Sequence, residues 1–389
     1  MKLKIAALAD LHLGYSQFPA IRNGRNAREF DIYATWHRVV NSICEHSPDL
    51  VTIAGDVFHR SRVSNHAIRA YLLGLNTILR RTYAEIHIVQ GNHEASRSAA
   101  VMCPNEIAHT LDSAGRIFTY ATAETHFDAE ERYILTALPF ETVARPNFIF
   151  PVTDPGKPSV LVIHGAIQAP GISKFYAGDN CPHIDDLAKH FDVICAGDYH
   201  DMTMLENDHC PAFYSGSIDF TSTNFWPERS DKGWMLVELD SGKAPALLPM
   251  NMEPPRPVID LTATGCTDAE RLNRYLDELY DHRAVEGADD EPIMRVVVPG
   301  FDRSDRPNID QTLVKRLKAQ CLHFQLDLRT VSAADDNGDA QTFQTRSLRD
   351  MFDEFFAGDP KPVRERAATL IDERWRDLTA PGELDARAT

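Results

Sequence analysis

The stretch of sequence that decides the fold is LKIAALADLH, residues 3–12. Its apolar run is short and ends at Asp10 and His12, two side chains that bind metal ions well. A short apolar run that is bounded by polar residues is typical of a buried strand. The stretch therefore predicts a strand that carries two candidate metal ligands at its carboxyl end.

The same pattern recurs four more times within the first 200 residues. The runs are LVTIAGD (50–56), IHIVQGNHE (86–94), VLVIHG (160–165) and VICAGDYH (193–200). They end on Asp56, Asn92, His164, Asp198 and His200. Sites in open α/β sheets lie beyond the carboxyl ends of the strands, so these side chains should meet Asp10 and His12 at one edge. A single Asp-x-His or Gly-Asp is common by chance, whereas five ligand-bearing strand ends in order predict a two-metal site.

Helix-like stretches lie between these strands, at residues 32–46, 64–81, 105–112 and 184–190. Further short apolar runs at residues 133–138 and 233–239 are predicted to be strands. Such alternation is typical of sheets with helices on their faces. We therefore predict an α/β domain over residues 1–250.

A composition change follows at MEPPRP, residues 252–257, where the prolines interrupt both helices and strands. We predict a second, small α/β domain over residues 257–331, with strands at 258–261, 293–298 and 323–329 and helices at 267–280 and 310–320. The polar, acidic stretch SAADDNGD (332–339) reads as a linker. Amphipathic helices at 347–356 and 362–378 are expected to form a C-terminal helical segment over residues 342–380.

The composition is that of a globular chain, because hydrophobic residues make up 43% and charged residues 25% of the 389 residues. No apolar run approaches the roughly 20 residues that a membrane helix needs. The apolar N-terminus ends at once in Asp-Leu-His, without a small-residue cleavage site. We therefore expect a buried first strand rather than a signal peptide, and a cytoplasmic protein.

The seven cysteines form no C-x-x-C pair, which argues against a disulfide framework and against a thiolate zinc site. The net charge of −17 argues against broad, sequence-independent coating of DNA, since phosphate binding needs Lys and Arg. It leaves room for a nucleic-acid enzyme, because a metal pair and a local basic cluster can supply positive charge where it is needed.

The series of motifs resembles the calcineurin-like metallophosphoesterases, whose pattern is D-x-H, G-D, G-N-H-[DE], H and G-H-x-H. The stretches YSGS (214–217), Glu228 and DKGW (231–234) are similar to the Y-x-G-S, E and K-G-[FW] motifs of SbcD-type nuclease subunits, as is GDVFH (55–59). The resemblance covers about residues 1–260. It implies a four-layer α/β sandwich with a small α/β capping domain and C-terminal helices.

For the site, the resemblance implies one metal ion held by Asp10, His12, Asp56 and His200. A second ion would be held by Asp56, Asn92, His164 and the residue at position 198, with Asp56 as the bridge. A carboxylate can span two cations roughly 3.5–4 Å apart, and mixed O and N ligands suit Mn²⁺, with Mg²⁺ or Fe²⁺ as alternatives.

Three further residues receive roles from the same resemblance. His93 would stand over the scissile phosphate as a general acid or as a stabiliser of developing charge. Glu94 would orient the His93 imidazole. His59 would help to position the DNA strand, or it is only a residue at the start of a surface helix.

The chain departs from the family pattern at Asp198, where a histidine is usual. With Asp10 and Asp56, three carboxylates then surround two divalent ions, and the formal charge of the site falls from +2 to +1. This should tighten cation binding, weaken the attraction for a phosphodiester and raise the pKa of bound water. We expect a working site with a shifted metal preference.

Basic residues near the first two motifs are candidate phosphate contacts: Arg22, Arg25, Arg28, Arg60 and Arg62. A solvated loop is the alternative for the first three. By resemblance, the helix at 64–81, with its apolar Ile68, Leu72, Leu75 and Leu79, would form a homodimer interface, although core packing explains the same spacing.

The C-terminal helices carry apolar side chains on one side: Leu348, Met351, Phe352, Phe355 and Phe356. By resemblance, they would dock on the coiled-coil base of an SbcC-like ATPase; the alternative is docking on the enzyme domain itself.

The leading hypothesis for function is a Mn²⁺-dependent DNA exo- and endonuclease that works with such an ATPase in DNA repair or recombination. A phosphodiesterase for small phosphoesters is a second reading, which the YSGS to DKGW stretch and the additional C-terminal units disfavour. A DNA-end-binding scaffold, with a metal site impaired at Asp198, is a third.

Overall fold

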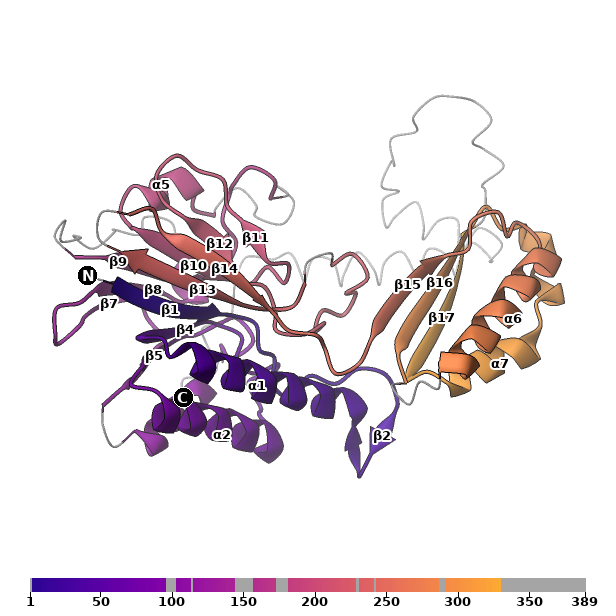
Figure 1. The fold of residues 1–389 in the computed structure, drawn as a ribbon, viewed down its shortest axis with the longest axis horizontal. Helices are drawn as coiled ribbons and strands as arrows, with labels where there is room; N and C mark the ends of the chain where they lie inside the picture. Colours follow the sequence, from indigo (N-terminus) through magenta and orange to yellow (C-terminus); the bar gives the residue numbers. More distant parts are fainter. Residues whose placement is uncertain are drawn as a thin grey trace, which may run out of the picture. The chain divides into compact units, whose positions relative to one another are not determined.

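Two six-stranded sheets lie face to face in the N-terminal part of the computed structural model (Figure 1). The structure describes residues 2–95, 103–112, 115–143, 157–172, 181–228, 231–240, 243–286 and 291–329. The first sheet has the order β14 (Ala246–Asn251), β13 (Gly233–Asp240), β1 (Lys2–Leu8), β4 (Leu50–Ala54), β5 (Glu85–Val89) and β6 (Ile117–Tyr120). The second has the order β11 (Thr203–Met204), β12 (Ala212–Tyr214), β10 (Val193–Gly197), β9 (Ser159–His164), β8 (Ile134–Leu138) and β7 (Glu124–Phe127).

The centre of each sheet is parallel and its margins are antiparallel. β1, β4, β5 and β6 run parallel, and so do β8, β9, β10 and β12. β13, β14, β7 and β11 pair antiparallel at the margins. Because parallel strands end at the same edge, this topology brings the ends of β1, β4, β5, β9 and β10 together.

Helices cover the outer face of each sheet. α1 (Ala27–His46) and α2 (Asn65–Arg81) pack on the first sheet, and α5 (Ile184–Ala188) packs on the second (Figure 1). β1 shows why, since Ile5 and Ala7 are buried between the sheets while Ala6 and Leu8 are buried under the helices. The order helix, sheet, sheet, helix confirms the four-layer α/β sandwich.

α1 begins five residues earlier than the pattern predicts. The Asn26 side chain accepts a hydrogen bond from the Arg28 backbone N–H, which caps the helix at Ala27 rather than at residue 32. α2 begins after Ser64, whose hydroxyl accepts from the Ala67 backbone N–H, close to the predicted start. The helix predicted over 105–112 is instead a 3₁₀ helix, η1 (Pro104–Leu111).

Smaller elements complete this part of the chain. They are the hairpin β2 (Ile21–Arg22) and β3 (Arg25–Asn26) and the short helix α3 (Phe140–Val143). The sequence pattern predicts neither the hairpin nor the strands β6, β7, β11, β12 and β14, which are short or weakly alternating.

A third sheet follows residue 257, with β15 (Val258–Thr262), β16 (Ile293–Pro299) and β17 (His323–Arg329) all parallel. α6 (Ala269–Glu286) and α7 (Gln311–Ala319) cover one face of it, and η2 (Arg303–Asn308) precedes α7 (Figure 1). Every predicted element of this unit is present, although α6 extends six residues beyond the predicted end. Its standing as a separate domain over 257–331 stays a prediction.

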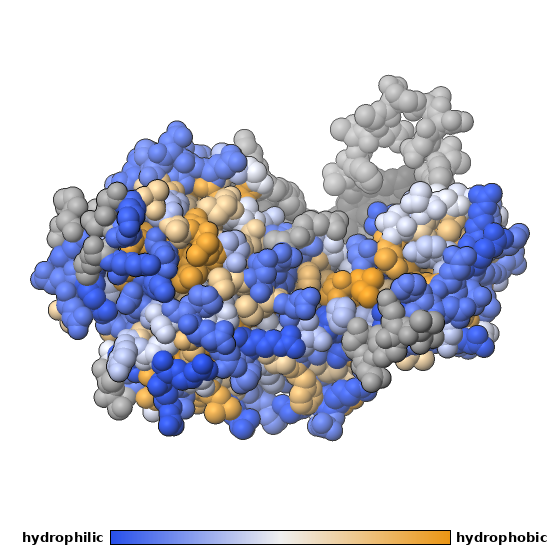
Figure 2. Space-filling model, viewed as in Figure 1, coloured by the Kyte–Doolittle hydropathy of each residue, from blue (hydrophilic) through white to orange (hydrophobic). Residues whose placement is uncertain are grey.

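The predicted C-terminal helices at 347–356 and 362–378 lie outside the described residues. Among the helices that the structure describes, none has the length and apolar character to cross a membrane. The molecular face in Figure 2 is largely hydrophilic with scattered apolar patches, in keeping with the high charge content of the chain.

Candidate metal centre

The candidate ligands lie just beyond the strand ends, in a backbone that is unusual for their residue types. Asp10, His12, Asp56 and Asp198 have positive φ values of 51°, 45°, 51° and 102°. Residues other than glycine adopt this left-handed region rarely, and such strain clusters at functional sites. The turns after β1, β4 and β10 therefore hold the candidate ligands in conformations that relaxed loops would avoid.

Gly55, directly before Asp56, combines a left-handed backbone with a close approach. Its φ is +80°, and a β-carbon there would lie 2.2 Å from Nδ1 of His164. The absence of a side chain lets His164 at the end of β9 lie against the turn after β4. In that position, His164 Nδ1 donates to the Ala54 carbonyl oxygen at 2.7 Å, which leaves Nε2 directed toward the other ligands.

Asp10, His12, Asp56 and His200 meet on one side of the centre. Nε2 of His12 lies 3.1 Å from Nε2 of His200 and 3.7 Å from Oδ2 of Asp56. Asp10, His12 and Asp56 are almost completely buried. Buried nitrogen and oxygen atoms with lone pairs that converge in this way form the set of donors that a divalent cation binds.

Asn92, His164 and Asp198 meet Asp56 on the other side. Nε2 of His164 lies 3.5 Å from Oδ1 of Asp56, 3.8 Å from Oδ1 of Asp198 and 3.0 Å from Oδ1 of Asn92. The amide oxygen of Asn92 thus points at acceptors only. Acceptors that face one another need a cation or a reversed amide between them, so these residues fit a metal ion.

The electrostatics of the cluster also call for positive charge. Burial, opposed by His200 and His164, raises the pKa of Asp10 to about 6. Burial lowers the pKa of His164, but Asp56, Asp10 and Asp198 outweigh it and raise the value to about 9. Without metal, the carboxylates therefore hold a proton on His164, which divalent ions would displace.

His93 lies beside this cluster and remains accessible. Its backbone N–H donates to Oδ1 of Asp56 at 3.0 Å, and its Nδ1 lies 2.7 Å from the His59 carbonyl oxygen. Nδ1 therefore carries a proton, while Nε2 lies 3.8 Å from Oδ2 of Asp56. The side chain is 34% exposed, so a substrate can reach Nε2.

His59 packs against the imidazole rings of His12 and His93. Its Nδ1 lies 3.3 Å from Nδ1 of His12, and its ring centre lies 5.1 Å from that of His93. Burial, with a smaller contribution from His93, lowers the pKa of His59 to about 4. A neutral imidazole next to His93 suits a positioning role better than direct pairing with phosphate.

Glu94 has other partners than the predicted one. Its carboxylate accepts from the backbone N–H of Phe58 at 2.7 Å and from that of Gly91 at 2.9 Å, and the side chain is fully buried. The prediction that Glu94 orients the His93 imidazole is wrong for this structure, because both oxygens are used by backbone donors. Glu94 instead joins the turn after β4 to the turn after β5.

The His200 imidazole is held by side chains to which the sequence analysis gave no role. Its Nδ1 lies 2.8 Å from the Ser222 hydroxyl, which in turn donates to Glu228. Lys232 donates to Glu228 and, at 2.9 Å, to the His200 carbonyl oxygen. The conspicuous Glu228 and Lys232 of the YSGS to DKGW stretch were the available signal for this arrangement, which fixes the imidazole.

The candidate DNA-binding arginines differ in how far they are exposed and paired. Arg28 is fully buried and donates to Asp31 at 2.9 Å and to Asp219 at 3.0 Å, so its prediction as a phosphate contact is wrong. Arg25 stacks over the Phe30 ring at 4.2 Å, and Arg22 pairs with Glu291. Arg60 and Arg62 are exposed in the loop after His59.

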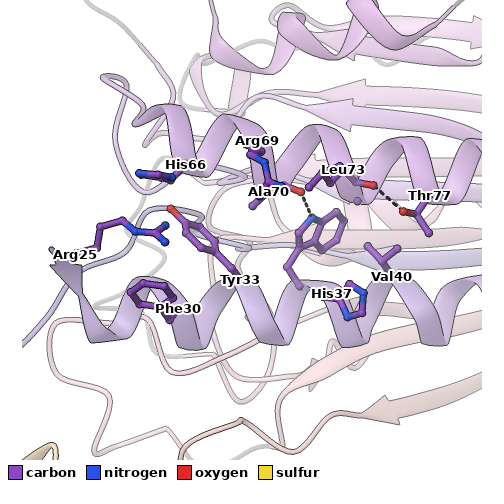
Figure 3. A pocket seen from close by; sticks show the side chains of 12 residues that line it. Arg25, Phe30, Tyr33, His37, Val40, His66, Arg69, Ala70, Leu73 and Thr77 are labelled. Carbon is purple, nitrogen blue, oxygen red and sulfur yellow. Dashed lines mark hydrogen bonds between the residues drawn. The ribbon is translucent and has the colours of Figure 1, made fainter. Parts of the chain in front are cut away.

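A cavity of about 490 Å³ lies between α1 and α2 (Figure 3). Arg25, Phe30, Tyr33 and Leu73 line it, and Leu73 is 49% exposed. Of the four apolar residues predicted on α2, Leu75 is fully buried, and Leu72 and Leu79 pack partly against the core. The apolar spacing of α2 therefore mainly reflects core packing, and the exposed apolar surface lies at the cavity.

A comparison with protein families finds that the model for calcineurin-like phosphoesterases matches residues 3–202. Among curated proteins, the chain is similar to DNA double-strand break repair protein Mre11 of Methanococcus maripaludis, with 24% identity over 250 residues, covering 61% of this chain and 63% of the relative. The Mre11 protein of Thermoplasma acidophilum is 24% identical over 310 residues, covering 75% of this chain and 76% of the relative. The match thus spans under two thirds of the first relative's length.

Two solved structures also match this chain. A dimetal phosphatase from Danio rerio matches with 12% identity and a TM-score of 0.35, covering 63% of this chain and 98% of that one. The phosphopantetheinyl hydrolase of Mycobacterium tuberculosis matches with 17% identity and a TM-score of 0.36, covering 62% and 98%.

Proposed function

Because the chain belongs to the calcineurin-like phosphoesterases, we propose that it is a two-metal phosphodiesterase that cuts DNA. One observation carries the proposal: side chains from five strand ends converge on Asp56, with Nε2 of His164 3.5 Å from Oδ1 and Nε2 of His12 3.7 Å from Oδ2 of this carboxylate. Positive charge at the centre stabilises such a buried cluster.

Asp10, His12, Asp56 and His200 would hold one ion. Asp56, Asn92, His164 and Asp198 would hold the other. Mn²⁺ suits this mixed set of carboxylate, amide and imidazole ligands, with Mg²⁺ and Fe²⁺ as alternatives. When bound, the pair supplies Lewis acidity at the phosphoryl group and lowers the pKa of water.

The side chains beside the ligands would handle the substrate. His93 presents Nε2 to the phosphodiester, where a protonated imidazole stabilises developing charge or protonates the leaving oxygen. His59 fixes His93 through its carbonyl oxygen, 2.7 Å from Nδ1. Glu94 keeps the two flanking turns together, so it supports catalysis through structure.

The similarity to Mre11 proteins, which are named for the repair of DNA double-strand breaks, supports DNA as the substrate. The exposed Arg60 and Arg62 and the partly exposed Arg22 lie on loops where they can contact phosphates. The small unit over 257–331 would act as a cap on the DNA.

Two protein partners complete the proposal. A second copy of the chain would cover the cavity between α1 and α2, since its exposed Leu73 and aromatic lining suit a helical homodimer interface (Figure 3). An SbcC-like coiled-coil ATPase would bind the helices predicted in 342–380.

The test is cleavage of linear and hairpin-ended double-stranded DNA with Mn²⁺, beside the His93→Ala variant. We expect cleavage by the native protein, and a loss of at least about 100-fold in the variant with DNA binding retained. Hydrolysis of bis-p-nitrophenyl phosphate without DNA cleavage would favour a small-phosphoester substrate. DNA binding without either activity would favour an end-binding scaffold, and the Asp198→His variant would show whether Asp198 is the cause.

A further inference from the structure

A second group of metal-binding side chains lies between the two sheets, away from the candidate metal centre. Glu85 and His87 come from β5, and His126 comes from β7. One ligand atom from each lies within 4.8 Å of the others. Oε2 of Glu85 is 3.7 Å from Nε2 of His87 and 3.8 Å from Nε2 of His126.

The topology explains why these three residues meet. Glu85 and His87 are two residues apart on one strand, so their side chains point to the same face of the first sheet. β7 is the margin of the second sheet beyond β8, and His126 approaches from there. Glu85 begins β5 whereas Asn92 follows its end, which separates the group from the candidate metal centre by roughly 20 Å.

The group is enclosed by hydrogen-bonding side chains, and one of its polar atoms lacks a partner among the described residues. His87 is fully buried, with Nδ1 2.8 Å from the Tyr120 hydroxyl and Nε2 3.0 Å from the Tyr133 hydroxyl. The Tyr133 hydroxyl donates to Glu85. Nε2 of His126 is buried, has no hydrogen-bond partner among the residues that the structure describes, and points at Glu85 from 3.8 Å. A buried nitrogen left in this way is costly unless another group binds it.

The charge states of His87 and Glu85 are those of metal ligands. Burial lowers the pKa of His87 to about 4, so its imidazole is neutral at pH 7. Polar contacts with His126, and then with His87, hold the pKa of Glu85 far below its usual value. Arg132 donates to Oε1 of Glu85 at 3.3 Å, whereas Oε2 accepts from the Tyr133 hydroxyl and faces the two histidines.

We propose that Glu85, His87 and His126 bind a Zn²⁺ ion through Oε2 and the two Nε2 atoms, with water as the fourth ligand. Two imidazoles and a carboxylate are a frequent zinc set, in which ligand atoms about 2.1 Å from the ion lie about 3.4 Å apart. The distances of 3.7 and 3.8 Å from Oε2 to the two Nε2 atoms therefore need to close by only a few tenths of an ångström, and the imidazoles offer ligand atoms within 4.8 Å of each other.

Binding rearranges one proton within the group. Tyr133 donates to the Glu85 carboxylate, so it accepts from Nε2 of His87 before the ion arrives. His87 then moves its proton to Nδ1, from which it donates to the Tyr120 oxygen, and Nε2 becomes free to ligate. The Glu85 and His126 side chains are each 17% exposed, which gives a hydrated ion access.

The consequence is a link between the sheets. The first sheet contributes two ligands from β5, and the marginal strand β7 contributes one from the second sheet. A strand at a sheet margin pairs with only one neighbour, so a metal ligand on β7 would hold that margin in register. The site would stabilise the fold without taking part in phosphoester hydrolysis.

The proposal is tested by counting metal ions on the full chain. The native protein, His126→Asn and Glu85→Gln are equilibrated with Zn²⁺ and dialysed, and bound zinc is measured by mass spectrometry. The control is His209→Asn, which removes an exposed histidine outside both clusters. We expect one zinc fewer per chain in the first two variants and no change in the control. Equal zinc counts in all proteins overturn the proposal.

A second measurement does not depend on the folding of the zinc-site variants, and it distinguishes this site from the candidate metal centre. Crystals of the native protein soaked in Zn²⁺ should show an anomalous peak between Glu85, His87 and His126. The peak should persist in an Asp10→Asn variant, in which the other centre is impaired. A native crystal without a peak at these three residues refutes the zinc site and leaves only a hydrogen-bonded network.

Discussion

Gly55→Ala tests whether the turn after β4 positions a ligand. Gly24 is a matched control, because its φ of +76° is close to the +80° of Gly55 but a β-carbon there would meet nothing within 4 Å. Both alanines adopt a left-handed backbone, which costs about 1–2 kcal/mol. Only the alanine at position 55 collides with His164, at 2.2 Å from Nδ1.

The contact with His164 determines how much more stability and activity Gly55→Ala should lose than Gly24→Ala. Ordinary contact begins at 3.4 Å, so the His164 ring has to move by roughly 1 Å from its 2.2 Å approach. This movement breaks the 2.7 Å bond to the Ala54 carbonyl oxygen, at a cost of about 1 kcal/mol. A ligand displaced by about 1 Å reduces the turnover rate by about 100-fold.

The assays are thermal unfolding, Mn²⁺ titration by calorimetry, and phosphodiester hydrolysis. We expect the Tm of Gly55→Ala to lie about 2–4 °C below that of Gly24→Ala for each additional kcal/mol lost. Mn²⁺ affinity and hydrolysis should fall in Gly55→Ala alone. If both variants bind Mn²⁺ and hydrolyse substrate equally well, His164 is not a ligand whose place depends on this turn.

Three more predictions follow from the contacts. Asp198→His removes one carboxylate from the site, so Mn²⁺ should bind more weakly by calorimetry while the KM for a phosphodiester falls; an unchanged Mn²⁺ affinity would mean that Asp198 is no ligand. Arg28→Ala leaves the buried Asp219 without its cationic partner, although Asp31 keeps Arg256, and should lower the free energy of unfolding by about 3–5 kcal/mol in urea titrations. Arg60→Ala should change the free energy of unfolding by under about 0.5 kcal/mol and lower the slope of DNA affinity against salt by about one phosphate contact. The pKa of His87 is lowered from an ordinary 6.5 to about 4, so between these pH values the unfolded chain binds more protons than the folded one. In metal-free buffer, the difference in free energy of unfolding between the native protein and His87→Gln should therefore be greatest above pH 6.5 and disappear toward pH 4. A difference that does not change with pH contradicts this.

The strands that end on candidate ligands could be predicted because each carries its own local signature. A short apolar run followed by Asp10, Asp56 or His164 needs no knowledge of the rest of the chain. The parallel topology then follows from the alternation with helices. The same reasoning located the small third sheet, whose strand over 323–329 has the predicted bounds.

Long-range pairing accounts for what the sequence could not predict. Arg28 looks like its neighbours in the sequence, but its partner Asp219 is 191 residues away, and only the fold places both in the core. Glu94 follows His93 directly, yet its carboxylate is drawn to the Phe58 N–H, 36 residues earlier. His126 belongs to a short strand without clear alternation, so nothing local connects it with Glu85.

The left-handed backbone at Asp10, His12, Asp56 and Asp198 limits which substitutions evolution and the experimenter can use there. Aspartate and asparagine tolerate this conformation better than other residues with a β-carbon. An alanine at Asp56 would therefore remove a candidate ligand and disturb the turn at once, and the two losses could not be separated. A lineage that abandoned the chemistry would be expected to drift toward asparagine or glycine at the aspartate positions, and Asp→Asn variants are the cleaner way to ask what each carboxylate does.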